Sequence, residues 1–299
     1  MTQIPTLHPS RAMELRAVVA VLHLAHSMSV TYRETRPPPE LARQVRRLWT
    51  LKGRGFDWAP EPIVPDGCSE VVLNFADPFR QVAVDGSYRR QPTSLLVGEI
   101  RRCVVTGPTG EIDLLGVRFK PGGAHALLGL PAVDLVDGMF DLTQCASARL
   151  QEGLARVLSA STADDRMKLL ERALATELRE NPSAHIVVAR AVRAITEHRG
   201  QIDLVTLESK LGVSSRHLER CFKECVGISP KAWSRVIRFR SLLGALAQPT
   251  VDWSALAQHH GYFDQSHLTR DFKQFSGMTP AAYVAGQRHV ADVFSVSGA

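Results

Sequence analysis

Two segments in the last third of the chain repeat each other, and no other feature constrains the fold as strongly. They run over residues 207–233 and 256–283. Seven side chains of the first segment recur fifty positions later, after a one-residue insertion in the turn: His217, Leu218, Arg220, Phe222, Lys223, Gly227 and Pro230. Because so many residue types match in register, we interpret the two segments as one supersecondary unit used twice.

The residue types at the ends of each unit predict a helix, a tight turn and a second helix. In the first unit, Asp203 is suited to cap a short helix that Gly212 ends, and Ser214 or Ser215 is suited to cap a longer one. Apolar side chains of the longer helix follow helical spacing: Leu218, Cys221, Phe222 and Val226. Residues 252–277 repeat this pattern. Two helices joined by a short turn that contains glycine form the helix-turn-helix unit, whose second helix enters the DNA major groove.

The net charge of the chain is concentrated around this repeat. Residues 190–288 carry 14 Lys and Arg against 8 Asp and Glu, and the difference equals the formal net charge of +6 for the whole chain. The remaining residues are therefore neutral in sum. A neutral body joined to a basic C-terminal part fits a nucleic-acid-binding module attached to a domain with another task, although without the repeat we would favour a merely solvated basic surface.

The sequence of both units resembles the DNA-binding domain of the AraC/XylS family of bacterial transcription regulators. The first unit carries SSRHLERCFKECVGISPKAW and the second carries GYFDQSHLTRDFKQFSGMTPAAY, and the resemblance extends over residues 183–288. It implies a sequence-specific transcription regulator in which a long linker helix holds the units at a fixed separation. It also implies that both second helices enter successive major grooves on one face of double-stranded DNA, and that RNA polymerase is a further partner.

The outward face of each second helix carries side chains suited to contact DNA, because leucine and phenylalanine occupy the inward face. These side chains are Ser215, Arg216, Glu219, Arg220 and Lys223 in the first unit, and Gln265, Ser266, His267, Arg270 and Lys273 in the second. Arg pairs with guanine, Gln pairs with adenine, and Glu accepts a hydrogen bond from cytosine. The two lysines, one turn farther along, are better placed for phosphates. A charged solvent-exposed face is the alternative, and the doubled motif favours DNA contact.

The N-terminal part is predicted to be rich in β-structure. Residues 64–120 contain short β-branched runs separated by Asp, Pro and Gly, a spacing typical of a small barrel or curled sheet. We predict a short helix over residues 40–48, after three prolines, and two amphipathic helices near residues 148–158 and 164–178. The predicted fold class is therefore α+β, with a β-rich sensor-like domain followed by an all-α domain that contains the two helix-turn-helix units.

Two short motifs connect the N-terminal part with the same family. VPDGCSE at residues 64–70 and RFKPGGA at residues 118–124 resemble the effector or partner regions of one of its branches. The resemblance implies a regulatory domain that binds a small-molecule effector or a partner, or that forms a homodimer. The identity of an effector does not follow from these motifs.

Composition and turn residues predict a division of the chain into four segments. They are a poorly ordered extension at 1–27, an N-terminal regulatory, effector or dimerisation domain at 28–182, a DNA-binding domain at 183–290 and a tail at 291–299. Within the DNA-binding domain, the first helix-turn-helix covers about 203–227, the linker helix about 230–246 and the second helix-turn-helix about 252–277. The boundary between the domains falls in a polar tract that ends at Pro182 and a serine.

No pattern in the sequence indicates a metal, a cofactor or a catalytic residue. The five cysteines are scattered and form no CxxC pair, which argues against a disulfide framework or a zinc ribbon and favours a reduced, cytoplasmic protein. His259 and His260 point to different sides of a helix, so we expect no metal there. Asp66, Cys68, Ser69 and Glu70 are interpreted as a turn leading into a strand rather than a nucleophilic site. No apolar run approaches the length of a membrane span, so no membrane partner is expected.

Two classes of function remain open at this point. The first is a transcription regulator without enzymatic activity, whose N-terminal domain senses a signal or dimerises. The alternative is a bifunctional protein whose N-terminal domain carries out chemistry, like the DNA-repair methyltransferases that contain an AraC-type module. That chemistry relies on a cluster of zinc-bound cysteines, which this sequence does not contain, so we predict the first class.

Overall fold

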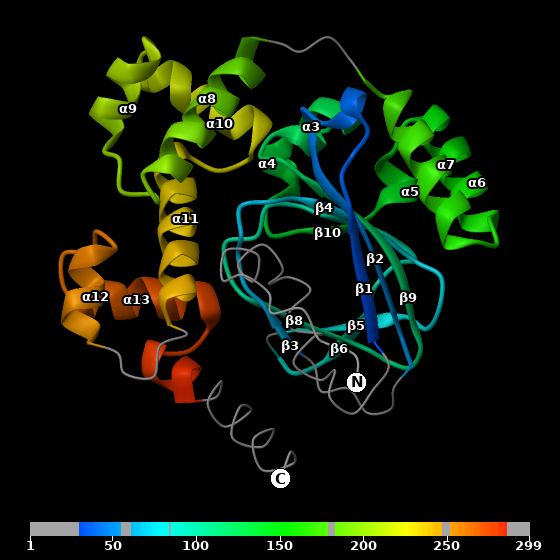
Figure 1. Ribbon diagram of the computed structural model, residues 1–299, viewed down its shortest axis with the longest axis horizontal. Coiled ribbons are helices and arrows are strands. Elements are labelled where there is room, and N and C mark those ends of the chain that lie inside the picture. Colours follow the sequence, from blue (N-terminus) through cyan, green and yellow to red (C-terminus); the bar gives the residue numbers. More distant parts are fainter. Residues whose placement is uncertain (1–29, 55–60, 84, 179–182, 247–251, 286–299) are drawn as a thin grey trace, which may run out of the picture.

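The chain folds into a β-rich N-terminal half and a helical C-terminal half that lie side by side (Figure 1). The computed structural model describes residues 30–54, 61–83, 85–178, 183–246 and 252–285. The α+β fold class predicted from the sequence is confirmed. The predicted extension at 1–27, the predicted tail at 291–299 and the polar tract at the predicted domain boundary lie outside the described residues.

The N-terminal half contains two antiparallel sheets. The six-stranded sheet has the order β1-β2-β9-β4-β7-β10 and the four-stranded sheet has the order β3-β8-β5-β6. The strands are β1 (Val30–Thr35), β2 (Val45–Gly53), β3 (Glu61–Ile63), β4 (Glu70–Asn74), β5 (Phe79–Val82), β6 (Tyr88–Arg90), β7 (Ser94–Val97), β8 (Val104–Pro108), β9 (Ile112–Phe119) and β10 (Met139–Asp141). Because β4 to β9 lie within residues 64–120, the prediction of a β-rich region there is confirmed.

The helix predicted over residues 40–48 is wrong. A single 3-10 turn, η1 (Pro39–Leu41), is followed by β2, which pairs with β1 on one side and with β9 on the other. Val45, Leu48 and Leu51 of β2 are buried. A strand that gains hydrogen bonds along both edges and buries apolar side chains outweighs the helical preference of the segment, because propensity is a weak prior against tertiary contacts.

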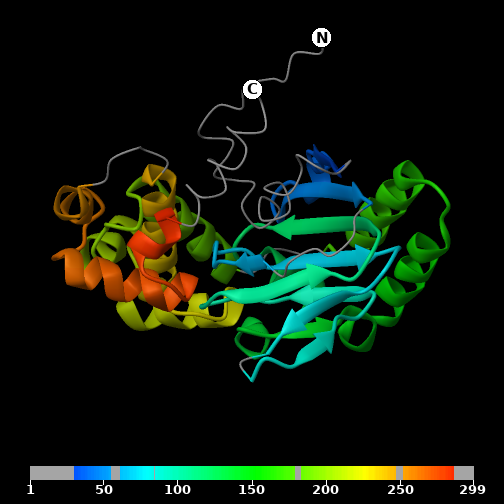
Figure 2. The ribbon, with the colours of Figure 1, turned by 90° about the horizontal axis from the view of Figure 1, so that it is seen from below.

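Helices cover one face of the six-stranded sheet (Figure 2). They are α3 (Gly123–Leu128), α4 (Ala132–Leu135), α5 (Leu142–Cys145), α6 (Ala148–Ser159) and α7 (Ala163–Ala175). The side chains of Ser147 and Thr162 cap α6 and α7 by accepting hydrogen bonds from backbone N–H groups of the first turn. Leu154 of α6 and Leu170 of α7 are buried in the same apolar cluster as the sheet. The two amphipathic helices predicted near residues 148–158 and 164–178 are thus confirmed.

The described residues of the C-terminal half form helices joined by turns and pack into two apolar clusters. Its helices are α8 (Ser183–Glu197), α9 (Leu204–Leu211), α10 (Ser215–Cys225), α11 (Pro230–Ala245), α12 (Trp253–His259) and α13 (Gln265–Ser276). The first cluster joins α8, α9 and α10 around Leu207 and Phe222, and the second joins α12 and α13 around Leu268 and Phe272. Among the described helices, none combines the length and the hydropathy that crossing a lipid bilayer requires.

Candidate nucleic-acid interface

Two capped helices, α10 and α13, begin at equivalent turns and form the centre of the candidate interface. The Ser214 hydroxyl accepts a hydrogen bond from the backbone N–H of His217 (3.3 Å), and the Asp264 carboxylate accepts one from that of His267 (2.7 Å). Of the two serines considered as the first cap, Ser214 has this role. The caps fix where each helix begins, and therefore which side chains lie on its outward face. We refer to α10 and α13 as the recognition helices.

The two recognition helices bury and expose equivalent positions. Each residue from 215 to 226 is buried, half-buried or exposed like the residue fifty positions later, over 265–276. Eight of the ten side chains predicted to contact DNA are exposed, namely Ser215, Arg216, Arg220, Lys223, Gln265, Ser266, Arg270 and Lys273. The other two, Glu219 and His267, are half-buried. The structure therefore brings the predicted residues onto two matched faces, one on each recognition helix.

The exposed arginines differ in whether they contact other side chains of their own helix. Arg220 reaches the Glu224 carboxylate (Nη1 to Oε2, 3.4 Å) and the Nδ1 of His217 (3.1 Å). Within the described part of the chain, Arg216 and Arg270 take part in no ion pair. Exposed ion pairs contribute little to stability, so Arg220 can give up its partner at small cost. All three guanidinium groups are thus available to a polyanion.

The helix α11 joins the two units and packs into both apolar clusters. Trp233 lies in the first cluster and Phe239 in the second. Arg235 binds the buried carboxylate of Asp271 in α13 (Nη2 to Oδ1, 2.7 Å). A helix of 16 residues spans about 24 Å at 1.5 Å per residue. Since both ends are anchored by packing, α11 holds the two recognition helices at a fixed separation.

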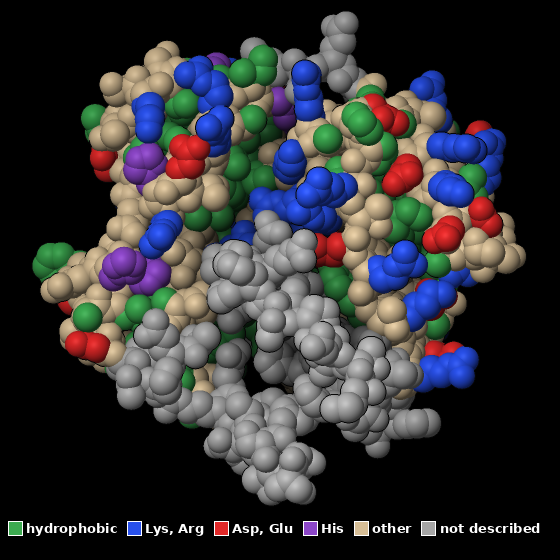
Figure 3. Space-filling view, viewed as in Figure 1, with side chains coloured by type: hydrophobic (Ala, Val, Ile, Leu, Met, Phe, Trp, Pro, Cys, Tyr) green, Lys and Arg blue, Asp and Glu red, His purple; other side chains and the backbone are tan. Residues whose placement is uncertain are grey.

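A basic hollow lies between the two halves of the molecule. It has a volume of about 650 Å³ and is lined by four cationic side chains, Arg43, Arg46, Lys120 and Arg190, and by no acidic side chain of the described residues. Figure 3 shows Lys and Arg side chains gathered between the halves. Burial, and then the positive charges of the neighbouring Arg46 and Arg47, lower the pKa of Lys120. Sequence reasoning missed this hollow because its residues are far apart in the chain.

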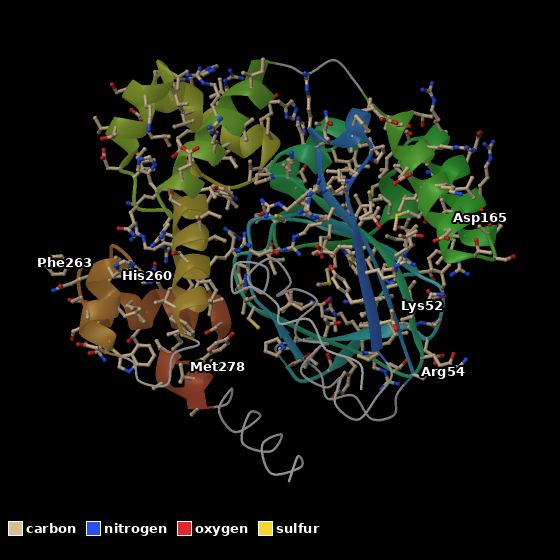
Figure 4. All side chains as sticks on the ribbon, in the orientation of Figure 1. Lys52, Arg54, Asp165, His260, Phe263 and Met278 are labelled. Atoms are coloured by element: carbon tan, nitrogen blue, oxygen red, sulfur yellow. The ribbon has the colours of Figure 1, made fainter. Side chains whose placement is uncertain are left out.

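An exposed aromatic side chain in the second unit was also missed. Phe263, in the turn before α13, is 89% exposed and points away from the rest of the molecule (Figure 4). Its backbone N–H donates to the Nδ1 of His267 (3.3 Å), so the imidazole is engaged by its own turn. The second unit has one residue more than the first in this turn. This insertion is the sequence feature from which Phe263 could have been identified.

The N-terminal motif VPDGCSE contacts the linker helix. The Gly67 carbonyl accepts a hydrogen bond from Trp233 Nε1 (3.5 Å), and the Asp66 carbonyl accepts one from Arg240 (2.7 Å). A Cβ on Gly67 would lie 2.9 Å from Trp233 Nε1, so the close approach needs a glycine. The Asp66 carboxylate accepts a hydrogen bond from the backbone N–H of Cys68 (3.0 Å), and this turn confirms the interpretation made from the sequence.

The second N-terminal motif, RFKPGGA, joins the first motif and contacts a recognition helix. Arg118 binds the carboxylates of Asp66 and Glu70, the latter at 3.1 Å. A Cβ on Gly122 would lie 3.4 Å from the Cβ of Cys225, at the end of α10. Both motifs singled out in the N-terminal half therefore lie where that half meets the helical half.

Comparison with known protein families gives one match in each half of the chain. Residues 207–286 match a family described as a helix-turn-helix domain, and residues 33–141 match a family described as a domain of unknown function (DUF6597). The first match contains both recognition helices and α11. The second match lies within the β-rich half.

Two curated relatives are similar to different shares of the chain. The arabinose operon regulatory protein of Escherichia coli (strain K12) is 24% identical over 216 residues, which are 62% of this chain and 73% of that protein. The bifunctional transcriptional activator/DNA repair enzyme Ada of the same organism is 32% identical over 98 residues, which are 32% of this chain. The matched part is 27% of the length of Ada, so the likeness concerns a minor part of that enzyme.

Solved structures that are similar to this chain include ToxT from Vibrio cholerae O395. Its chain aligns with 86% of this chain over 97% of its own length, at 9% sequence identity and a TM-score of 0.38.

Proposed function

We propose that the recognition helices of this DNA-binding transcription regulator, which carries an AraC-type helix-turn-helix domain, read successive major grooves on one face of the DNA. The observation that carries the proposal is the matched exposure of α10 and α13, which turns two equivalent faces outward. A helix of this kind reads base edges with the residues near its N-terminus. The anchored helix α11 keeps the two readers at one separation.

The predicted contacts divide into residues that read bases and residues that hold phosphates. The proposed readers lie in the first turns of the recognition helices: Ser215, Arg216, Glu219 and Arg220 in α10, and Gln265, Ser266, His267 and Arg270 in α13. Lys223 and Lys273 are the proposed phosphate contacts, because each stands farther from the N-terminus of its helix. We add Phe263 to the proposal, as an apolar contact for a thymine methyl group beside the α13 element.

A binding selection with the full chain on random duplex DNA tests this function. The expected site has two unlike sequence elements about ten base pairs apart, since one turn of DNA is roughly 34 Å long. Binding should weaken steeply with salt, at about 0.9 units of log K per unit of log salt for every phosphate contacted. A symmetric site, a single element or an affinity that does not depend on salt would contradict the proposal.

The N-terminal half is proposed to control DNA binding through its contacts with α10 and α11. The motif VPDGCSE contacts α11 through Gly67, and the motif RFKPGGA contacts α10 through Gly122. The division into a regulatory domain at 28–182 and a DNA-binding domain at 183–290 belongs to this proposal. So do RNA polymerase as a partner, a homodimer, a cytoplasmic location and the lack of an enzymatic activity. In the docked arrangement the two halves are in contact, and in the undocked arrangement they are apart. A ligand acts as an effector only if its affinities for these two arrangements differ.

We propose the basic hollow as the site of a small anionic effector. Its four cations come from both halves, so an anion bound among them changes how firmly the halves are joined. Thermal melting of the full chain with a panel of carboxylates and phosphates tests the proposal. Arg190→Gln should lose the stabilisation, whereas Arg193→Gln should keep it, because Arg193 lies on the same helix but pairs with Glu197 outside the hollow. Equal responses of the two variants would place the anion elsewhere.

A further inference from the structure

Three side chains with metal-binding atoms converge where the two halves meet. They are His125 of α3, His185 of α8 and Cys225 of α10, and one ligand atom of each lies within 4.8 Å of the other two. His185 and Cys225 are buried and His125 is half-buried. The first residue belongs to the N-terminal half and the other two to the C-terminal half. This group is therefore assembled only when the halves are docked.

The ring of His125 is oriented in the way that a metal ligand requires. Its Nδ1 lies 2.7 Å from the backbone carbonyl of Leu130. Because a carbonyl oxygen only accepts hydrogen bonds, Nδ1 carries the proton, and Nε2 keeps a lone pair for a cation. Histidines that bind metals are held by a carbonyl or a carboxylate on the other nitrogen in this manner. The ring of His185 stacks on that of His125, with 5.2 Å between the centroids.

The chemistry of the three side chains selects zinc. Two imidazoles and one thiolate form a ligand set of zinc sites, in which three protein ligands leave the fourth position to water or another ligand. Zinc–nitrogen bonds of about 2.0 Å and zinc–sulfur bonds of about 2.3 Å place tetrahedral ligand atoms about 3.3–3.5 Å apart. The side chains then have to approach each other by about an ångström, which small side-chain rotations supply. His185 also lines the basic hollow, so the fourth position has access to an anion.

We propose that His125, His185 and Cys225 bind one Zn²⁺ ion, which clamps the N-terminal half to the first recognition helix. As the zinc–sulfur bond forms, the thiol of Cys225 releases its proton to solvent, so one proton leaves for each ion bound. Since the ligands come from both halves, zinc stabilises the docked arrangement and docking in turn strengthens zinc binding. The effect of the ion on DNA reading by α10 rests on the function proposed above, whereas the metal site itself does not.

The competing interpretation is an uncharged contact between the same side chains. Burial raises the pKa of the Cys225 thiol to about 12, and burial followed by the neighbouring His125 lowers the pKa of His185. Without a metal, the thiol and the imidazole are therefore neutral at physiological pH and pack as a weakly polar surface. The two interpretations differ in whether an added metal ion binds and changes the stability of the protein.

Titration of the metal-free full chain with Co²⁺ tests the site directly, because a thiolate bound to cobalt gives a charge-transfer absorption that histidine alone does not give. The wild-type chain should bind one Co²⁺ with this absorption, and Zn²⁺ should displace it. Cys225→Ala should lose the absorption, while Cys221→Ala should keep it. Cys221 is the matched control because it is equally buried, one turn earlier on α10, beside His217.

Thermal melting with and without Zn²⁺ gives a second measurement that needs no DNA. Zinc should raise the Tm of the wild type and of Cys221→Ala by more than that of His125→Gln. The ring of His125 is only half-buried, so its replacement is compatible with folding. The zinc affinity of His125→Gln should fall by more than about tenfold, since even the loss of a partner that only orients a ligand costs 10–100-fold. A wild type without thiolate absorption, or a His125→Gln variant with wild-type affinity, would overturn the proposal.

Discussion

At the scale of single residues, the proposed DNA recognition depends on what the two recognition helices turn outward, because both helices bury the same positions. Arg220 and Arg270 occupy equivalent exposed positions, whereas Arg216 is matched by Ser266. The repeated scaffold thus carries two unlike outward surfaces. A duplicated unit of this kind favours an asymmetric DNA site, in contrast to a symmetric dimer that reads a palindrome.

The first prediction concerns the two equivalent arginines. Arg220→Ala should cost about 1–3 kcal/mol of binding free energy and relax the base preference in one element of the site only, and Arg270→Ala should do the same in the other. Lys223→Ala should weaken binding to all sequences alike, because a phosphate contact carries no sequence information. Binding selections on the three full-length variants measure these effects. If both arginine variants relaxed the same element, the model with two readers would be wrong.

A buried histidine makes the second unit sensitive to acid. His260 (Figure 4) is 3% exposed, and its Nδ1 lies 3.2 Å from the Ser241 hydroxyl. Burial, and then the neighbouring His259 and Arg199, lower the pKa of His260 to about 4. The unfolded chain, with a pKa near its ordinary value of about 6.5, therefore binds a proton more readily than the folded chain. This contribution to stability is complete above about pH 6.5 and is lost as the pH falls towards 4.

The second prediction follows from that difference in pKa. Between about pH 7 and about pH 4.5, the wild type should lose on the order of 2 kcal/mol of unfolding free energy because of His260, and His260→Gln should be spared this loss. Denaturant unfolding at the two pH values measures it. His259→Gln is the control, because it removes only a smaller cause of the shift and leaves the burial of His260 in place, so most of the pH dependence should remain. Equal pH dependence of His260→Gln and wild type would refute the assignment.

At the scale of elements, the two units are held to α11 by different forces. Position 271 in α13 is an aspartate with a side chain only 4% exposed, paired with Arg235, whereas the equivalent residue of α10 is Cys221 in an apolar cluster. A buried ion pair contributes little net stability, but removing one partner leaves the other charge buried and unpaired. The second unit is therefore the one that an electrostatic substitution on α11 should disturb.

The third prediction tests this tie. Arg235→Ala should cost about 3–5 kcal/mol of unfolding free energy, and the double variant Arg235→Met, Asp271→Leu should recover most of it by filling the same space with apolar groups. Arg193→Ala, which breaks an exposed pair on α8, should cost less than about 1 kcal/mol and is the control. Denaturant unfolding of the four proteins measures the differences. A cost of Arg235→Ala no larger than that of the control would show that the ion pair is not important.

Elements with local signals were predictable from the sequence, and elements that depend on distant partners were not. Asp203 and Asp252 accept hydrogen bonds from the first turns of α9 and α12, as their residue types indicated. The segment that forms β2 looked helical, because its strand character comes from pairing with β1 and β9 rather than from its own residues. The outward residues of α10 and α13 could be named from helical spacing. The basic hollow and the group around Cys225 could not, since tertiary contacts alone unite their residues.

At the scale of the whole molecule, the N-terminal half contacts the recognition helix α10 and the linker helix α11 as well as α8. Gly227, directly after α10, lies against α4 of the N-terminal half, and a Cβ there would be 2.5 Å from the carbonyl oxygen of Ala132. The equivalent Gly277 follows α13, and a Cβ there would have no neighbour among the described residues within 4 Å. Both glycines have a positive φ, 91° and 79°. Gly227 and Gly277 are thus equivalent positions of the repeat, and only Gly227 lies against the N-terminal half.

The last prediction uses this pair to separate docking from local strain. In Gly227→Ala and Gly277→Ala, alanine has to adopt a left-handed backbone conformation, which lowers the free energy of unfolding by about 1 kcal/mol in both variants. Only in Gly227→Ala does the new Cβ also collide with α4. We therefore expect Gly227→Ala to undock the halves and to increase the radius of gyration in solution scattering, while Gly277→Ala keeps the wild-type value. In the proposed function, the undocked variant should also bind DNA without responding to an effector, because the N-terminal half no longer contacts α10. If Gly227→Ala had the wild-type radius of gyration and its DNA binding still responded to an effector, control of DNA binding would have to pass through the contacts of α11 instead.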